Sequence, residues 1–201
     1  MMNFNYVAGS TPLDHDESKD LIPAHITVQE ELNAWEFNNI LIAQIWALKK
    51  KKNIVSLEFI QKLHEKMFDK TWKWAGQFRK SEKNIGIHWA QVPIKLTELC
   101  DNVQYQLDHD VYSKDEIAIR FHHALVAIHA FPNGNGRHAR LMADLLIRQQ
   151  GGKRFSWGLQ QSLQISTGDL YQATPVRKQY IEALQLADRG DFSRLLAFAR
   201  S

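Results

Sequence analysis

Residues 129–140, His-Ala-Phe-Pro-Asn-Gly-Asn-Gly-Arg-His-Ala-Arg, constrain the fold more than any other stretch of the chain. Residues 117–128 before them carry apolar side chains at helical spacing, and residues 141–147 after them predict a second helix. Pro132 ends the first helix, and the two glycines permit backbone angles and close approaches that a side chain would forbid. The stretch is therefore expected to be a short loop between two buried helices.

This loop also collects groups that suit a nucleotide. A helix that follows it begins with N–H groups that lack intrahelical partners and point into the loop, which favours an anion. Arg137 and Arg140 lie three residues apart, so they are expected on one face of that helix, and His129 stands at the mouth. On spacing alone, an ordinary turn with solvated arginines and a core histidine remains an alternative, because glycine-rich loops are weak signals when taken singly.

The full series is more specific. It reads His-x-Phe-x-x-Gly-Asn-Gly-Arg-x-x-Arg and resembles the signature loop of the Fic family. The matching residues are His129, Phe131, Gly134, Asn135, Gly136, Arg137 and Arg140. Residues 74–79 resemble the segment that leads to the target-docking flap of that family, and the resemblance spans about residues 11–200. The stretches 11–14, 21–23 and 180–198 are similar to the branch called mobile mystery protein B.

The expected fold is all-α: a helical bundle of the Fic fold with one small β-hairpin, the flap. Residues 83–89 alternate loosely around Gly86 and give the strand signal. The domain organisation is expected to be an N-terminal arm (1–25) without regular structure and a Fic domain (26–201). The helix at about 27–49 is apolar over much of its girth and is expected to be central to the core. Further helices are expected at 56–68, 93–109, 113–128, 159–163, 170–173, 177–187 and 193–200.

Composition excludes several classes of protein. One cysteine, Cys100, excludes an internal disulfide, and a net charge of +3 gives no argument for a nucleic-acid partner. No apolar run is long enough to span a membrane, and residues 1–10 lack the features of a secretory signal. A cytoplasmic location is therefore expected.

The resemblance implies transfer of AMP from ATP to a Ser, Thr or Tyr hydroxyl of a target protein. His129 would accept the proton of the attacking hydroxyl. Residues 134–136 would cradle the α- and β-phosphates through backbone N–H groups and the Asn135 amide, while Arg137 and Arg140 would hold the β- and γ-oxygens.

The same resemblance implies two further roles. Phe131 is expected to point into the core and anchor the loop. The flap residues are expected to align a target segment by main-chain hydrogen bonds. These residues are Asn84, Ile85, Gly86 and Ile87.

One residue departs from the pattern that the resemblance implies. Where the family usually has an acidic magnesium ligand, this chain has Asn133, whose carbonyl brings no negative charge. Mg²⁺ is therefore expected to accompany ATP but to bind more weakly. Two alternatives remain open: a Doc-like phosphotransferase, and a catalytically weak Fic-fold protein that acts by binding.

Regulation is the second gap. Many Fic proteins carry a self-inhibitory Ser/Thr-x-x-x-Glu-Gly/Asn helix, and the nearest match, Thr27 to Glu31, is followed by Leu32. A separate inhibitory protein is therefore expected, with this chain as the toxin half of a toxin–antitoxin pair. Of the remaining histidines, His64 is expected to be structural and His138 exposed. His122, two helical turns before His129, is expected to be structural, with support of the site from behind His129 as the alternative.

Overall fold

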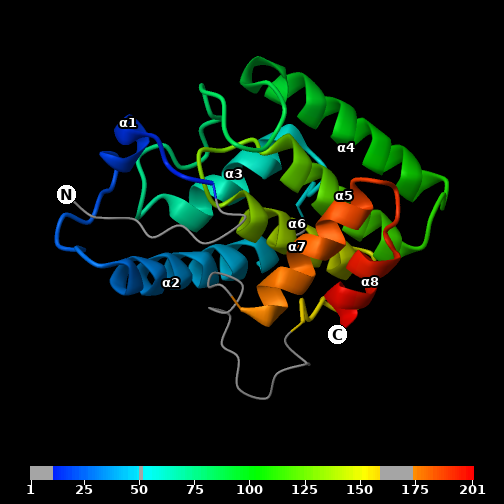
Figure 1. Ribbon diagram of the computed structural model, residues 1–201. Coiled ribbons are helices and arrows are strands. Elements are labelled where there is room, and N and C mark those ends of the chain that lie inside the picture. Colours follow the sequence, from blue (N-terminus) through cyan, green and yellow to red (C-terminus); the bar gives the residue numbers. More distant parts are fainter. Residues whose placement is uncertain (1–10, 50–51, 159–173) are drawn as a thin grey trace.

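The computed structural model describes residues 11–49, 52–158 and 174–201, and the regular secondary structure in these ranges is almost entirely helical (Figure 1). The expectation of an all-α fold is therefore confirmed. No described helix is long and apolar enough to cross a lipid bilayer. The helices are α1 (His15–Ser18), α2 (Gln29–Leu48), α3 (Leu57–Phe68), α4 (Val92–Asp108), α5 (Lys114–Ile128), α6 (Asn135–Gln149), α7 (Pro175–Ala187) and α8 (Ser193–Arg200), with a 3-10 turn, η1 (Trp89–Gln91), before α4.

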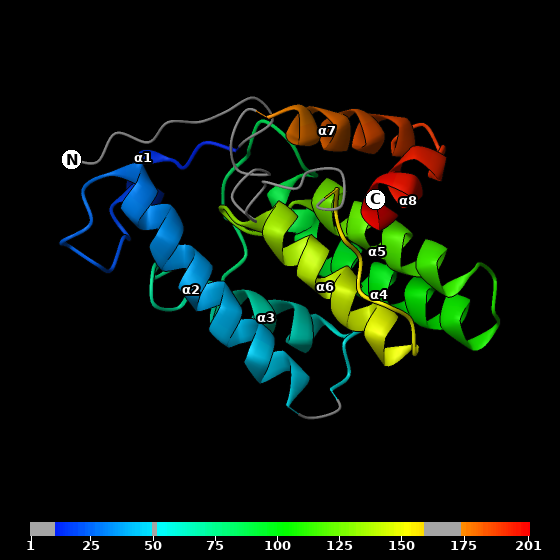
Figure 2. The ribbon, with the colours of Figure 1, turned by 90° about the horizontal axis from the view of Figure 1, so that it is seen from below.

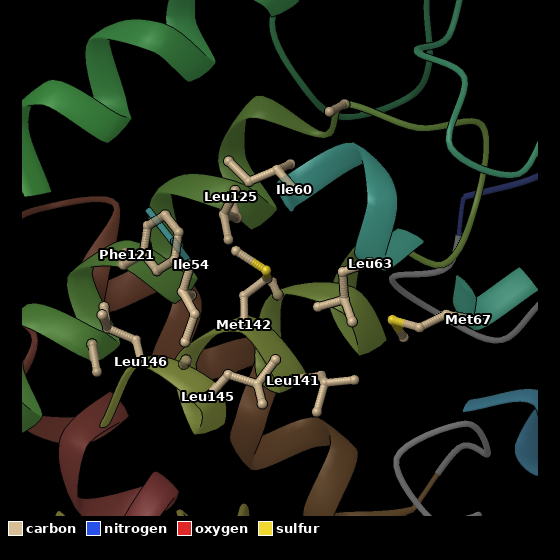
Figure 3. Packing of buried hydrophobic residues seen from close by; sticks show 14 of the residues in the cluster. Ile54, Ile60, Leu63, Met67, Phe121, Leu125, Leu141, Met142, Leu145 and Leu146 are labelled. Atoms are coloured by element: carbon tan, nitrogen blue, oxygen red, sulfur yellow. The ribbon is translucent and has the colours of Figure 1, made fainter. Parts of the chain in front are cut away.

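The core is centred on α5 and α6, which pack against each other along their lengths (Figure 2). Helices α4 and α8 cover α5, while α2 and α3 pair with each other and contact α6. Phe121 and Leu125 of α5 meet Met142 of α6 in the centre of this packing (Figure 3). The loop between the two central helices is therefore held from both sides by the core.

Polar side chains start several of these helices where the sequence predicts them. The hydroxyl of Ser113 accepts a hydrogen bond from the Glu116 N–H at the start of α5, at 3.2 Å, and Ser56 does the same for Phe59 in α3. Helix α6 differs, since it begins at Asn135 after Gly134, with no side-chain cap, and it includes Arg137 and Arg140 as expected. Much of the sequence motif therefore lies on the first turns of α6.

Helix α2 is not central to the core, contrary to the expectation from its composition. It lies at one edge of the molecule, and Ile42 and Ile45 are 65% and 58% exposed (Figure 2). The buried residues of α2 include two small alanines and two polar side chains, Glu36 and Asn39. The prediction of a central position rested on apolar content alone. It was wrong because the apolar residues of α2 are spread around the helix axis instead of gathering on the packed face.

The arm and the flap also differ from expectation. The arm contains the short helix α1, whose first turn carries a capping box between Asp14 and Glu17. Residues 83–88 form a loop of bends with no strand pairing, and within the described ranges the isolated bridge is between Leu21 and Trp72. The hairpin is absent because the carbonyl of Ile87 accepts its hydrogen bond from the Arg79 side chain instead of a partner strand. The helical pieces expected at 159–163 and 170–173 lie outside the described residues.

Candidate active site

His129 ends α5 in a left-handed backbone conformation, with φ 55° and ψ 59°. This turn directs the chain away from the helix axis and into the loop. The imidazole is 5% exposed, and its Nε2 lies 3.0 Å from the hydroxyl oxygen of Thr11. Burial, with a smaller contribution from the Arg79 charge, lowers the pKa of His129 to about 4, so the ring is neutral at pH 7. A neutral imidazole at this position is able to accept a proton.

The guanidinium of Arg79 forms hydrogen bonds that hold the backbone turn at His129. It is 2% exposed, and its Nε donates to the His129 carbonyl at 2.6 Å while another of its nitrogens donates to the Ile87 carbonyl. The backbone N–H of Arg79 also donates to the Ala130 carbonyl at 3.0 Å. One buried side chain thus joins the histidine turn to the flap. The sequence analysis missed this role; the available signal was an arginine that follows a stretch rich in aromatic residues.

Phe131 and His64 anchor the loop in the core. Phe131 is 1% exposed, and its ring stacks on His64 with centroids 3.7 Å apart and planes 14° apart. The Gly76 N–H donates to His64 Nδ1, so the ring proton is on Nε2 and donates to the Asn133 carbonyl at 3.0 Å. His64 is structural, as expected, but it also fixes the backbone of the loop.

Asn135 braces the loop with its side chain. Its Oδ1 accepts from the Phe131 N–H at 2.9 Å, and its Nδ2 donates to the Phe131 carbonyl at 2.8 Å. The amide that was expected to contact phosphate is therefore occupied within the loop. Asn135 is the first residue of α6, and its backbone N–H belongs to the turn where intrahelical acceptors are missing.

The two glycines of the loop have different surroundings. Gly134 has φ 79°, and a Cβ built on it would lie 2.5 Å from Cζ of Phe68, so the fold itself demands glycine there. A Cβ on Gly136 would lie 3.6 Å from a guanidinium nitrogen of Arg140, an ordinary contact. Packing within the fold therefore does not require glycine at position 136.

The two arginines of the motif contact different helices. Arg137 forms an ion pair with Glu36 of α2 and lies over the Phe68 ring, 4.9 Å from its centroid. The guanidinium of Arg140 lies over the ring of Tyr180 on α7, 5.3 Å from its centroid. Both arginines start from one helical face, but their present partners lie on opposite sides of α6.

Two of these partners were missed by the sequence analysis. Glu36 is 5% exposed and also accepts a hydrogen bond from Trp72 Nε1 at 2.7 Å. Tyr180 is 4% exposed, and its hydroxyl lies 3.0 Å from Nε2 of the buried His122. Glu36 lies on the packed face of α2, but the apolar residues of this helix are spread around its axis, so the sequence did not show which face is packed.

Asn133 is occupied by bonds within the protein. Its Nδ2 donates to the Thr11 carbonyl at 3.0 Å, and its Oδ1 accepts from the Gly134 N–H at 2.6 Å and from Arg137 at 3.3 Å. Throughout the described residues, no three acidic, histidine or cysteine side chains gather as a metal site would need. The loop therefore does not fit a metal ion held by the chain itself.

The flap passes directly over His129. Asn84, Ile85 and Gly86 are exposed, and Ile87 is half-buried. Gly86 has φ 111°, and a Cβ built on it would lie 2.7 Å from Cβ of His129. The structure thus brings the four flap residues and the histidine together, with exposed backbone beside the ring.

His138 is buried, contrary to the expectation from its sequence position. It is 2% exposed, and its Nε2 lies 2.9 Å from the Ile60 carbonyl. Burial lowers its pKa to about 4. His64 and His122 also have pKa values well below the usual range because burial disfavours the charged ring. The expectation failed because α6 is covered on the His138 side by α3.

Fold and site together define a helical domain in which a histidine ends one central helix and two arginines lie on the first turns of the next. A sequence model described as the Fic/DOC family matches residues 54–147. Residues 54–147 of the chain thus match the Fic/DOC family, as the loop motif indicated. Within that family, the more specific likeness to mobile mystery protein B stays a prediction.

Individual relatives agree with the family. The chain is 25% identical over 159 residues to a protein adenylyltransferase Fic of Aedes aegypti, and 30% identical over 108 residues to protein adenylyltransferase fic-1 of Caenorhabditis briggsae. These alignments cover 75% and 52% of the chain but 28% and 21% of the relatives. The chain thus matches only about a quarter of the length of these curated relatives.

Solved structures share the fold. Fic-1 of C. elegans superposes with a TM-score of 0.65 at 22% identity, covering 92% of this chain and 51% of that one. BepC of Bartonella tribocorum, solved with bound AMPPNP, superposes with a TM-score of 0.66 at 17% identity, covering 93% and 97%. The all-α Fic fold expected from the sequence is therefore confirmed.

Proposed function

We propose that the protein is an adenylyltransferase that moves AMP from ATP to a Ser, Thr or Tyr hydroxyl of a target protein. The observation that carries this proposal is the neutral His129, with a hydroxyl oxygen 3.0 Å from its Nε2, at the mouth of the loop that starts α6. The names of the matched relatives, which are protein adenylyltransferases, support the same reaction.

The residues would divide the work as follows. Nε2 of His129 takes the proton of the acceptor hydroxyl as its oxygen attacks the α-phosphorus, and pyrophosphate leaves. Backbone N–H groups at Gly134, Asn135 and Gly136 hold phosphate oxygens at the start of α6. Arg140 and Arg137 offset negative charge on the leaving group, and Arg137 must first loosen its pair with Glu36.

Magnesium enters this proposal only with the nucleotide. Since Asn133 already uses both amide atoms within the protein, it is at most a weak ligand, and Mg²⁺ is expected to be held by the ATP phosphates. When bound there, the ion would neutralise phosphate charge. The chain's own contribution is the N–H groups and arginines of α6.

The remaining assignments belong to the same proposal. The flap (84–87) aligns the target segment through its exposed backbone, within a Fic domain of residues 26–201 preceded by an arm of residues 1–25. The protein acts in the cytoplasm as the toxin half of a pair, in the mobile mystery protein B branch, and a separate antitoxin inhibits it.

A binding protein without transfer is the second candidate. The observation that favours it is that both Arg137 and His129 have partners within the chain, Glu36 and Thr11. Such a protein would bind ATP without transferring any part of it.

Label transfer distinguishes these functions. The purified protein is incubated with cell lysate and ATP labelled at the α- or the γ-phosphate, with and without Mg²⁺, beside a His129→Ala control. Label from the α-position only, lost in the control, is the expected result. Label from the γ-position only would indicate a Doc-like phosphotransferase. ATP binding without any label, repeated with lysates of several sources, would favour the binding protein.

A further inference from the structure

The start of the described chain lies across the active site. Residues 11–18, here called the strap, run from α1 to the loop between α5 and α6 (Figures 1 and 2). At the loop, Thr11 is 7% exposed and makes two contacts with motif residues. Its hydroxyl oxygen lies 3.0 Å from His129 Nε2, and its carbonyl accepts from Asn133 Nδ2 at 3.0 Å. The strap therefore ends at the proposed catalytic base.

Charged contacts hold the strap to the flap loop. The ammonium of Lys83 lies 2.9 Å from a carboxylate oxygen of Asp14 and 2.5 Å from one of Glu17, and the Lys83 side chain is 2% exposed. The Ser81 hydroxyl donates to Asp14 at 2.7 Å. These hydrogen bonds lower the pKa of Asp14. A buried lysine bound by two acids of the strap is a specific attachment, because an unpaired buried ammonium would be costly.

The Thr11 hydroxyl oxygen and His129 Nε2 lie at hydrogen-bond distance, as a proton transfer between them requires. At pH 7 the imidazole is neutral, so one ring nitrogen carries a proton and the other accepts. Nδ1 makes no hydrogen bond of ordinary geometry within the described chain, but the nearby Val126 carbonyl favours a proton there. Nε2 is then the acceptor, and the Thr11 hydroxyl is the donor.

The hydroxyl is not needed to hold the strap. The Thr11 carbonyl already binds Asn133, and Asp14 and Glu17 bind Lys83. What the threonine adds is an oxygen nucleophile within hydrogen-bond reach of the base, where an acceptor hydroxyl has to lie.

We propose that Thr11 is an acceptor of the chain's own reaction, presented to His129 by the strap for intramolecular adenylyl transfer. This inference rests on the proposed function. The Thr11 oxygen forms a bond to the α-phosphorus of ATP, the bond from that phosphorus to the bridging oxygen of the β-phosphate breaks, and pyrophosphate leaves. The Thr11 proton moves to Nε2 of His129. The product is an adenylyl phosphodiester on Thr11.

The test uses the full chain alone with ATP labelled at the α-phosphate, followed by peptide mapping of the label. The expected result is one AMP group on Thr11, absent in Thr11→Val and in His129→Ala and retained on the new hydroxyl of Thr11→Ser. Thr27→Val, which removes an exposed threonine, is the matched control and should keep the label. Because transfer within one chain is first order, its rate constant should not change on serial dilution.

The outcomes separate this inference from the proposed function. Label on lysate proteins but none on Thr11 would overturn the inference and leave the adenylyltransferase in place. Label on Thr11 at a rate that falls with dilution would overturn the intramolecular step. No label on Thr11 or on any lysate protein would overturn both. Thermal unfolding of Thr11→Val checks that a lost label does not come from a lost fold. If Thr11→Val is unfolded, label on the serine hydroxyl of Thr11→Ser supports the inference, and its absence from the folded Thr11→Ser variant overturns it.

Discussion

Glu36 of α2 and Arg137 of α6 form an ion pair that places a buried carboxylate at the N-terminal end of α6. The other oxygen of Glu36 accepts from Trp72 Nε1 at 2.7 Å, so the carboxylate is fixed in position. It neutralises one of the two cations that ATP would use. The arginine and its acid lie far apart in the sequence, and their contact was not visible in the motif itself.

Replacing Glu36 with Gln should strengthen ATP binding. The amide oxygen of Gln is able to keep the Trp72 hydrogen bond, while Arg137 regains an unneutralised charge. We expect ATP to bind about tenfold more tightly, equivalent to about 1.4 kcal/mol, and the fold to lose about 1–3 kcal/mol with the buried pair. Isothermal titration calorimetry and urea unfolding measure the two effects.

Glu31→Gln is the matched control for this change. Glu31 is exposed on the same helix, and its carboxylate accepts only from the Thr27 N–H among the contacts of the described chain, so ATP affinity should stay at the wild-type value. Weaker ATP binding in Glu36→Gln would mean that the carboxylate positions Arg137 for phosphate.

Alanine at the two loop glycines should separate folding from nucleotide binding. Gly134→Ala forces a left-handed residue, at about 1–2 kcal/mol, and a contact of 2.5 Å with Phe68, which adds about 1–3 kcal/mol. Gly136→Ala meets nothing closer than 3.6 Å and gains up to about 1 kcal/mol of helix propensity. We expect Gly136→Ala to melt no lower than wild type yet bind ATP more weakly. Unchanged ATP affinity in that variant would argue against phosphate at the first turn of α6.

The sequence was sufficient for much of the fold because several elements are locally specified. Ser56 and Ser113 start their helices as capping predicts, and the loop motif placed His129 at a helix end. The misplaced elements depend on long-range contacts. The flap is a loop because Arg79 takes the place of a partner strand, and His138 is buried because α3 covers it.

The same distinction holds within the site. The spacing predicted that His129, Arg137 and Arg140 lie around one loop between two helices, but it carried no information on their partners. Thr11, Glu36 and Tyr180 reach the site from distant parts of the chain through tertiary packing. Local patterns in one sequence predict helices and loops, but they do not show which residues that are far apart in the chain come into contact.

Removing the Arg79 side chain should release the flap and the histidine turn together. Arg79→Met leaves the carbonyls of Ser81, Ile87 and His129 without their donor, at about 1–3 kcal/mol for each group that stays buried. We expect faster amide hydrogen exchange at 80–88 and at 129–130, together with loss of label transfer. Lys80→Met, which changes an exposed neighbour, should alter neither. Faster exchange confined to the flap would show that His129 is held by α5 alone.

Acid should destabilise the protein through its buried histidines. The pKa of His138 is lowered from 6.5 to about 4, so below pH 6.5 the unfolded chain binds a proton that the folded chain refuses until about pH 4. The contribution of His138 to the free energy of unfolding is therefore fully present above pH 6.5. It falls by about 3 kcal/mol as the pH is lowered from 6.5 to 4. Urea unfolding across this range measures the slope of stability against pH, which His138→Gln should reduce by about one proton. An unchanged slope in His138→Gln would mean that His138 is hydrated or mobile enough in solution to take up its proton without unfolding.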